Sequence, residues 1–319
     1  MEQKAKELDK WFVVVNPNAG NRKIKRDWPE IKKLMANQGL AFDFAMTEGP
    51  LHAIELTGKA LLKGYKKFIA IGGDGTLNEV ANAMINFEGY NAAEYLLGLI
   101  PVGTGNDWGR MFNIPKNYKP AINTIAEGKT FLQDVGKISY FNGEKPETRY
   151  FINIAGMGFD ALVAQKTNRQ KAAGRGNVLS YFVNLFTSLF QYESRIIQVE
   201  LDDKKFNFHT FSMSVGICKY NGGGMMQLPN AIPDDGLLDI TIIKKIGLGT
   251  VLAQLRNLYT GRFIKHPKVA TFTARNVKIT SRKNGFMMEA DGESLGQAPF
   301  DVNILPRALK VIVGKEFVL

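Results

Sequence analysis

The sequence has 319 residues, of which 45% are hydrophobic and 22% are charged, and its formal net charge is +11. This composition is too apolar for a disordered chain and too polar for a protein with several membrane spans, and the length predicts about two domains. The single cysteine, Cys218, excludes an internal disulfide framework and a zinc site built from several cysteines.

The chain contains no segment typical of a signal peptide or a membrane span. Residues 1–10 are mostly polar, and the apolar run at residues 11–15 is too short for a signal-peptide core. The longest uncharged stretch, residues 176–192, is short and polar for a spanning helix. We therefore expect a soluble protein of a reducing compartment. Its positive charge fits a phosphate-bearing partner, an anionic membrane or simply a solvated surface, whereas the clustered basic and aromatic residues of single-strand nucleic-acid binders are not evident.

The first third of the chain alternates between patterns typical of strands and helices. Apolar runs at residues 11–16, 42–46, 67–71 and 96–101 predict strands. Between the first two, apolar residues at near-helical spacing from Ile24 to Leu34 predict a helix, and Pro50 stands where a second helix can begin. This alternation indicates a mostly parallel sheet covered by helices, which binds its ligands at the carboxyl ends of the strands.

After about residue 131 the pattern changes to short, alternating segments rich in β-branched and aromatic residues. They predict an antiparallel, all-β second domain, interrupted by helices at residues 176–192 and 248–259. We place the boundary so that residues 1–133 form an α/β domain and residues 134–303 a β-rich domain. The predicted strands cover residues 131–138, 149–155, 195–201, 206–218, 237–243, 269–273, 276–280 and 286–290.

Three of the first four predicted strands end in turns rich in glycine or asparagine. Glycine lets backbone N–H groups approach an anion, and a following helix adds a favourable dipole, so these loops predict a polyanion site at one edge of the sheet. A plain glycine turn, with Asp74 capping the next helix, is the alternative for the second loop. Neither the P-loop pattern nor the dinucleotide pattern G-x-G-x-x-G is present. The loops are Asn16-Pro17-Asn18-Ala19-Gly20, Gly72-Gly73-Asp74-Gly75-Thr76 and Gly103-Thr104-Gly105-Asn106-Asp107.

Two acidic turns stand out in the second half. Asp234 and Asp235 lie beside a glycine, an arrangement that can bind a hard cation or form an exposed turn. Asp291 and Glu293 flank Gly292 where a predicted strand reaches a turn, and an Asp-Gly pair there is commonly only the turn of a hairpin. A general base, or two carboxylates that hold Mg²⁺, is the functional alternative.

Taken together, these motifs resemble the catalytic-domain superfamily of diacylglycerol kinases, and most closely its soluble bacterial lipid kinases. Sphingosine kinases and NAD kinases are related to them. The Gly72 loop alone also fits an NAD kinase, whereas the Gly103 loop and the late Asp-Gly-Glu point to the lipid-kinase branch. The resemblance runs in family order along nearly the whole chain: the three loops, Leu77-Asn78-Glu79, and residues 222–225, 234–239 and 291–293.

The resemblance implies a phosphofructokinase-like and NAD-kinase-like α/β domain for the nucleotide, a β-sandwich-like domain for the lipid, and an active-site cleft between them. Residues 304–319 would return to the first domain. The implied reaction transfers the γ-phosphoryl group of ATP, with Mg²⁺, to a lipid hydroxyl. Diacylglycerol is the default substrate, and another long-chain alcohol, a sphingoid base and phosphatidylglycerol stay open. Glu293 would take the hydroxyl proton, while Asp291 and Asp74 would help to place Mg²⁺ or its waters.

The resemblance also implies residues for the nucleotide and for a structural metal. The carbonyls of Ile232 and Leu237, with the side chain of Asp235, would hold a structural Mg²⁺. The residues implied for ATP lie in the three loops and on neighbouring elements: Asn16, Pro17, Asn18, Thr47, Gly72, Gly73, Asp74, Gly75, Thr76, Glu79, Gly103, Thr104 and Asn106.

The implied partner is a lipid at an anionic membrane surface, which places the protein in the cytoplasm, peripheral to the inner membrane. No nucleic acid and no obligate protein partner is implied, and a homodimer stays open. Basic residues such as Lys166 and Arg169 precede the predicted helix at residues 178–190, whose apolar stripe either packs on the second domain or contacts lipid. The alternatives to a lipid kinase are an NAD kinase and a non-catalytic nucleotide- or lipid-binding sensor on the same fold.

Overall fold

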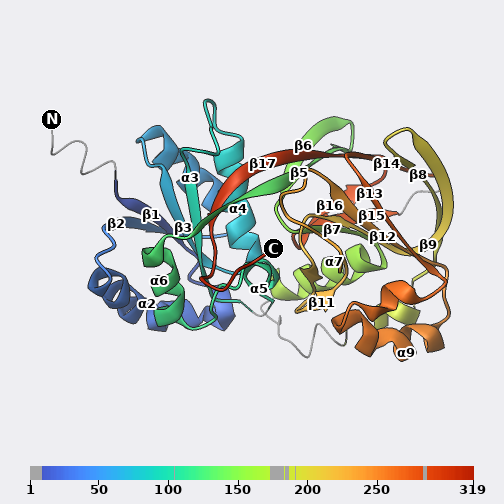
Figure 1. Ribbon diagram of the computed structural model, residues 1–319, viewed down its shortest axis with the longest axis horizontal. Helices are drawn as coiled ribbons and strands as arrows, with labels where there is room; N and C mark the ends of the chain where they lie inside the picture. The colour runs from blue at the N-terminus through green and yellow to red at the C-terminus, as the bar shows by residue number, and fades with distance from the viewer. Residues whose placement is uncertain (1–8, 104, 173–182, 184–186, 191, 283–285) are drawn as a thin grey trace. The chain divides into compact units, whose positions relative to one another are not determined.

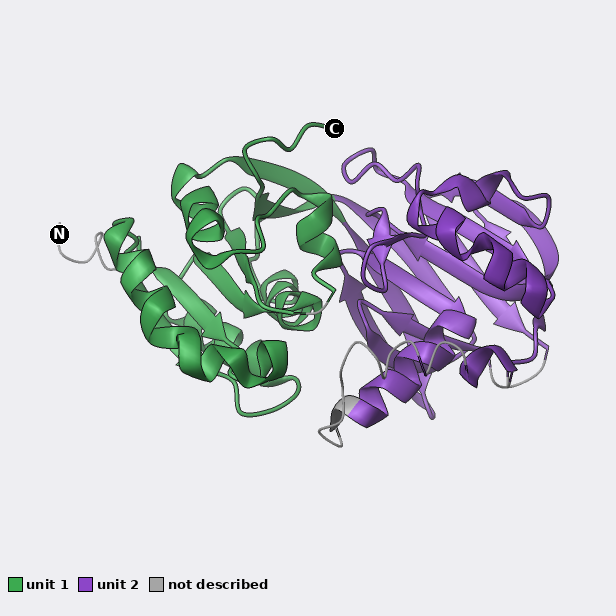
Figure 2. Ribbon diagram, turned by 90° about the horizontal axis from the view of Figure 1, so that it is seen from below, with its two compact units in different colours: residues 1–134, 307–319 green, residues 135–306 purple. Residues whose placement is uncertain are grey.

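The chain divides into two compact units in the computed structural model: residues 1–134 with 307–319, and residues 135–306 (Figure 2). The structure describes residues 9–103, 105–172, 183, 187–190, 192–282 and 286–319. The chain passes between the units twice, within β5 (Thr130–Asn142) and within β17 (Phe300–Ile312). Unit 1, the first of the two, is therefore built from both ends of the described chain.

Unit 1 contains a parallel sheet in the order β4–β3–β1–β2 (Figure 1). The predicted strands are confirmed as β1 (Trp11–Val15), β2 (Phe42–Met46), β3 (Lys67–Gly72) and β4 (Leu96–Pro101). Since these strands run in the same direction, the loops that follow β1, β3 and β4 leave from one edge of the sheet. The end of β17 adds to β4 in parallel, with Val311 opposite Leu97.

Helices cover both faces of this sheet. On one face, Ile24, Trp28 and Ile31 of α2 (Ala19–Asn37) pack on alternate residues of β1 and β3, together with α6 (Tyr118–Glu127). The predicted helical spacing is therefore that of α2. On the other face, α3 (His52–Leu62) contacts β1, and α4 (Asp74–Ile85) contacts β3. Burying each such large apolar side chain stabilises the fold by roughly 1.5–3 kcal/mol.

The C-terminal segment completes unit 1. Phe317 packs against Phe112 and Phe131, with 5.2 Å between the ring centroids in each pair. The ammonium of Lys129 donates hydrogen bonds to the carbonyls of Lys315 and Phe317, at 3.0 Å and 2.7 Å. Aromatic packing and capped carbonyls thus hold residues 307–319 on unit 1.

Unit 2 is rich in antiparallel strands, organised around β9 (Lys204–Gly216). The first half of β9 pairs with β8, and its second half pairs with β7 on one side and β12 on the other. In β14, Val277 and Ile279 are buried and alternate with exposed residues, the pattern of a strand with one covered face. The strands of this unit, besides β5, β9 and β17, are β6 (Lys145–Phe151), β7 (Ile154–Gly158), β8 (Arg195–Leu201), β10 (Tyr220–Asn221), β11 (Met225–Met226), β12 (Leu238–Lys244), β13 (Val269–Ala274), β14 (Asn276–Ser281), β15 (Met287–Ala290) and β16 (Glu293–Gln297).

The helices of unit 2 agree only in part with the sequence pattern. The helix predicted at residues 248–259 is confirmed as α9 (Leu248–Tyr259), and a short 3₁₀ helix, η1 (Arg262–Lys265), follows it. The sequence pattern does not predict α7 (Phe159–Ala172), because basic and polar residues interrupt any apolar stripe. Most of the predicted helix at residues 178–190 lies outside the described residues. No helix in the described part of the chain has the length and hydropathy needed to cross a bilayer.

One predicted strand, at residues 149–155, is wrong in its continuity. β6 ends at Phe151 and β7 begins at Ile154, so the ladder is broken between them. The break has a physical cause, since the N–H groups of residues 152, 153 and 154 donate to one buried carboxylate, that of Asp291. A backbone donor bound to a side chain is lost to the strand ladder.

Candidate active site

The three glycine- and asparagine-rich loops meet at the carboxyl edge of the unit 1 sheet. The Asn16 side-chain amide donates to the hydroxyl of Thr76 at 3.0 Å, which links the first loop to the second. A Cβ atom on Gly103 would lie 3.0 Å from the Cα of Gly73, so the second and third loops touch through glycine backbone. Only glycine permits this approach.

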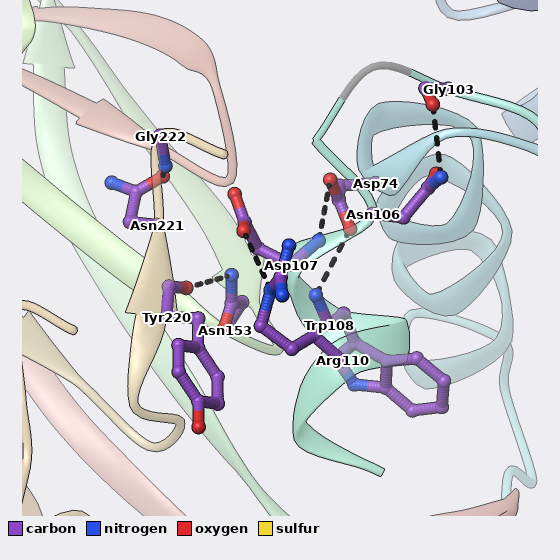
Figure 3. A network of polar contacts seen from close by, with 10 residues as sticks. All are labelled: Asp74, Gly103, Asn106, Asp107, Trp108, Arg110, Asn153, Tyr220, Asn221 and Gly222. Carbon is purple, nitrogen blue, oxygen red and sulfur yellow. Dashed lines mark hydrogen bonds and ion pairs between the residues drawn. The ribbon is translucent and has the colours of Figure 1, made fainter. Parts of the chain in front are cut away.

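Asp74 joins the second loop to the third. Its carboxylate accepts hydrogen bonds from the backbone N–H groups of Asp107 and Trp108, at 3.2 Å and 3.1 Å (Figure 3). Asp74 therefore caps the start of the short helix α5 (Asp107–Met111), in addition to standing as the first residue of its own helix, α4. Burial raises the pKa of Asp74, and the surrounding backbone N–H groups oppose that shift.

The third loop is held in an unusual backbone conformation. Asn106 has φ 50° and ψ 45°, in the left-handed region, and its side-chain amide donates to the carbonyl of Gly103 at 2.9 Å (Figure 3). Asparagine tolerates this region because its short side chain can bond to nearby backbone. Beyond the loop, the fully buried Trp108 donates from its indole nitrogen to Gln133 at 2.9 Å. Thr104, which the resemblance assigns to ATP, lies outside the described residues.

The start of α4 has the properties of an anion site. The first N–H groups of an α-helix have no partner within the helix, and Gly73, which precedes α4, provides no side-chain cap. The turn before α4 is tightly packed, since a Cβ atom on Gly72 would lie 2.5 Å from the hydroxyl oxygen of Thr76. The start of α4 therefore offers backbone N–H groups of the kind that bind a phosphate.

The remaining residues assigned to ATP lie around this edge of the sheet. Thr47 is buried after β2, and its N–H donates to the carbonyl of Val15 at 2.8 Å. The carboxylate of Glu79 accepts the N–H groups of Leu51 and Ala53, both at 3.1 Å, and so caps α3. In the first loop, which includes Pro17, the N–H of Asn18 donates to the side-chain oxygen of Asn16 at 3.0 Å.

In unit 2, Asp291 fixes the turn between β15 and β16. One of its carboxylate oxygens accepts the N–H of Ile152 at 2.8 Å, and the other accepts those of Asn153 and Ile154, both at 3.1 Å. The backbone of Asp291 is left-handed, with φ 48°. A carboxylate that accepts several backbone N–H groups is a strong local anchor, so Asp291 has the geometry of a positioning residue.

Two further side chains hold Gly292, the next residue of the turn. The carboxylate of Glu289 accepts the N–H of Gly292 at 2.7 Å, and the side-chain amide of Asn168 in α7 donates to the carbonyl of Gly292 at 2.6 Å. Burial raises the pKa of Glu289 to about 8, and the negative charges of Asp160 and Asp291 add to this shift.

Glu293 follows this anchored turn as the first residue of β16 and is half-buried. Within the part of the chain that the structure describes, no hydrogen bond or ion pair engages its carboxylate. A carboxylate without a partner on an anchored turn is available to accept a proton from a bound hydroxyl group.

The residues assigned to a structural Mg²⁺ lie before β12. A carboxylate oxygen of Asp235 accepts the N–H of Leu237 at 2.9 Å, and Ile232 is 46% exposed. Burial raises the pKa of Asp239 to about 6, and the negative charge of Asp235 contributes. Carboxylate and carbonyl oxygens are the donor types that Mg²⁺ prefers in proteins. Among the described residues, no group of three or more His, Cys, Asp or Glu side chains gathers where it could hold a metal ion.

Comparison with known proteins assigns both parts of the chain. Residues 10–138 match the family model described as the diacylglycerol kinase catalytic domain, and residues 153–313 match the YegS C-terminal NAD kinase beta sandwich-like domain. The chain is 30% identical over 308 residues to a diacylglycerol kinase of Staphylococcus carnosus, with 95% of each chain covered. It is 31% identical, with the same coverage, to a diacylglycerol kinase of Staphylococcus saprophyticus. The chain belongs to the diacylglycerol kinase family.

A solved structure shares the fold of this family member. The crystal structure of a diacylglycerol kinase from Bacillus anthracis superposes with a TM-score of 0.72 at 21% identity, covering 97% of this chain and 98% of that one. The combination of an α/β first domain and a β-rich second domain, which the sequence predicts, is thereby confirmed. The interpretation of the chain as an enzyme of the lipid-kinase class is confirmed as well.

Sequence reasoning missed several residues that shape the two sites of this diacylglycerol kinase family member. Glu289 and Asn168 anchor Gly292, and Gln133 anchors Trp108, yet none of these residues lies in a recognisable motif. The one available signal was a glutamate at residue 289, inside a run of apolar strand residues, because a buried charge needs a partner.

Proposed function

We propose that this protein transfers the γ-phosphoryl group of ATP, in the presence of Mg²⁺, to the hydroxyl group of diacylglycerol. The carrying observation is the match to diacylglycerol kinases over 95% of the chain, which includes all three loops and Asp291-Gly292-Glu293. Because the relatives are named diacylglycerol kinases, we propose this lipid as the substrate rather than sphingoid bases, phosphatidylglycerol or other long-chain alcohols.

In this proposal the backbone of unit 1 binds the phosphates. The N–H groups at the start of α4 face the anion, while Asp74 keeps the start of α5 in place through Asp107 and Trp108. The loop glycines exclude the side chains that would keep a phosphate away. When bound, ATP supplies the transferred group and Mg²⁺ neutralises phosphate charge.

Glu293 is the proposed general base. Its carboxylate takes the proton of the lipid hydroxyl, which makes the oxygen a better nucleophile. Asp291 acts through the backbone: by binding the N–H groups of residues 152–154 it fixes the turn that carries Glu293. Asp235, with the carbonyls of Ile232 and Leu237, would hold a structural Mg²⁺ whose role is to stabilise the turn before β12.

The proposed setting is the cytoplasmic surface of the inner membrane. A net charge of +11 favours association with anionic lipids, each basic residue near such a surface contributing about 1 kcal/mol. A sedimentation assay with vesicles of phosphatidylglycerol and phosphatidylcholine tests this, since only the anionic vesicles should retain the protein at low salt.

The test of the function is transfer of radiolabelled phosphate from ATP to diacylglycerol in mixed micelles, with sphingosine, phosphatidylglycerol and NAD as parallel acceptors. We expect diacylglycerol to be phosphorylated, and the Glu293→Gln variant to lose turnover while retaining its fold. Glu144→Gln, in the exposed turn after β5, is the matched control. Transfer to NAD alone would make the protein an NAD kinase. ATP binding without transfer to any acceptor would make it a sensor.

A further inference from the structure

Unit 2 contains a cavity to which no role has been given. It has a volume of about 460 Å³ and lies where the first turn of α9 faces β9, Leu189 and residues 192–194. This volume falls within the range of roughly 300–1,000 Å³ typical of small-molecule sites. The lining includes none of the residues assigned to phosphoryl transfer or to Mg²⁺.

One side of the cavity is apolar and firmly packed. Phe211 of β9 is buried and stacks on Phe159, with 4.8 Å between ring centroids, while Tyr192 meets Phe211 edge-on at 5.6 Å. Ile246 and Val251 pack against the same cluster and also line the cavity. Aromatic and branched aliphatic side chains of this kind offer apolar contact area to a hydrocarbon chain.

Lys245 and Glu193 are the two charged residues in the lining of the cavity. Lys245 is exposed there, and no ion pair engages its ammonium within the described chain. His209 also lines the cavity: its carbonyl accepts the N–H of Lys245 at 2.7 Å, and its Nε2 contacts the carbonyl of Ser194 at 3.2 Å. The one carboxylate among the lining residues, that of Glu193, lies 3.7 Å from Arg195 in a solvent-exposed ion pair.

The backbone around the rim adds to this electrostatic character. Leu248 and Val251, in the first turn of α9, both line the cavity, so the N-terminus of the helix borders it. That turn contains no acidic residue, and Gly247 before it provides no side-chain cap. The dipole and the free N–H groups of a helix N-terminus favour a negative group nearby.

We propose that this cavity binds a single-chain anionic amphiphile, a long-chain fatty-acid carboxylate, with its hydrocarbon chain against Phe211 and Val251 and its carboxylate beside Lys245. Apolar side chains beside the Lys245 ammonium and the N-terminus of α9 are complementary to this class of ligand. The proposal does not depend on the phosphoryl transfer proposed above, since it uses separate residues and is tested by binding. The neutral chains of diacylglycerol and the anionic head group of a phospholipid are the competing occupants.

Direct binding to the full-length protein tests the proposal, with isothermal titration of monomeric oleate as the probe. Oleyl alcohol, dioctanoylglycerol and a monomeric short-chain phosphatidylglycerol are measured in parallel. We expect saturable binding of oleate, and weaker binding of the two neutral ligands and of the phospholipid. Tighter binding of either neutral ligand, or of the phospholipid, would overturn the assignment of the occupant.

Two pairs of variants locate the binding. Val251→Trp fills the cavity and should weaken oleate binding roughly tenfold or more, whereas Leu252→Trp, the exposed neighbour on α9, should not. Lys245→Glu should weaken oleate binding without affecting oleyl alcohol, and Lys204→Glu, exposed at the β8–β9 turn, is its control. Unchanged oleate affinity in both Val251→Trp and Lys245→Glu would overturn the proposal. Because Lys245 is exposed, that variant remains informative even if Val251→Trp unfolds.

Discussion

Asp74 and Trp108 are joined by a hydrogen bond of 3.1 Å between a buried carboxylate oxygen and a backbone N–H. With the matching bond to Asp107, it ties the start of α4 to the start of α5 across two loops that are separated in sequence by about thirty residues. The carboxylate itself is thus part of the framework that orders the backbone of these two loops.

The Asp74→Asn variant should remain folded and lose phosphoryl transfer. The asparagine amide keeps one acceptor oxygen but places an NH₂ group against one of the two backbone N–H donors, those of Asp107 and Trp108. A buried donor left without an acceptor costs about 1–3 kcal/mol. The measurement pairs thermal unfolding with the diacylglycerol assay. Asp203→Asn, on the exposed β8–β9 turn, serves as control. Wild-type turnover in Asp74→Asn would contradict the role given to this carboxylate.

Substitutions of Asp291 and of Glu293 should differ in their effect on the stability of the fold. Asp291→Asn removes an acceptor from three backbone N–H groups, so it should lower both the unfolding midpoint and the activity. Glu293→Gln should lower activity alone, because no partner of its carboxylate is lost. Chemical denaturation and turnover of both variants test this pair, and an equal loss of stability in the two would count against a free carboxylate at Glu293.

Tyr192→Phe should leave the free energy of unfolding unchanged or raise it by up to about 1 kcal/mol. The reason is that its buried hydroxyl has no hydrogen-bond partner within the described chain. Tyr118→Phe is the matched comparison, since the Tyr118 hydroxyl donates to Asp27 at 2.8 Å, and it should destabilise by roughly 1–3 kcal/mol. Denaturant titration of both variants measures the difference in their free energies of unfolding. A clear loss of stability in Tyr192→Phe would refute the prediction.

The contributions of Asp160 and Asp27 to the free energy of unfolding should change with pH in opposite directions. Burial raises the pKa of Asp160 from 3.8 to about 6, so the folded state holds this proton more tightly than the unfolded state. Wild type and Asp160→Asn should differ least in stability below pH 3.8, and wild type should lose stability relative to the variant as pH rises toward 6.

Hydrogen bonds from Arg26 and Tyr118 lower the pKa of Asp27, so its contribution has the reverse sign. That contribution is present above pH 3.8 and disappears as the pH falls below that value. Asp27→Asn should therefore cost stability at neutral pH and little in acid. Unfolding measured from about pH 2 to pH 7 compares the two variants, a range that extends below the pKa of an ordinary aspartate. Parallel profiles would disprove the opposed shifts.

Local patterns predicted most of unit 1, because apolar runs followed by glycine turns identify the strands and loops of a parallel sheet. Helix α9 likewise followed from its spacing. The break between β6 and β7 could not be predicted, since it depends on Asp291, which is distant in sequence and bonds to residues 152–154. The anchoring of Gly292 by Glu289 and Asn168 was hidden for the same reason. Side chains that act on remote backbone leave no periodic signal.

The return of residues 307–319 to unit 1 has a consequence for biosynthesis. The ribosome synthesises β1 to β4 early. Val311, which pairs with Leu97, and Phe317, which packs on Phe112 and Phe131, are synthesised only after all of unit 2. This flank of the nascent unit 1 therefore remains uncovered until residues 135–306 have been synthesised. Chaperones that shield apolar surface would act on the chain during that interval.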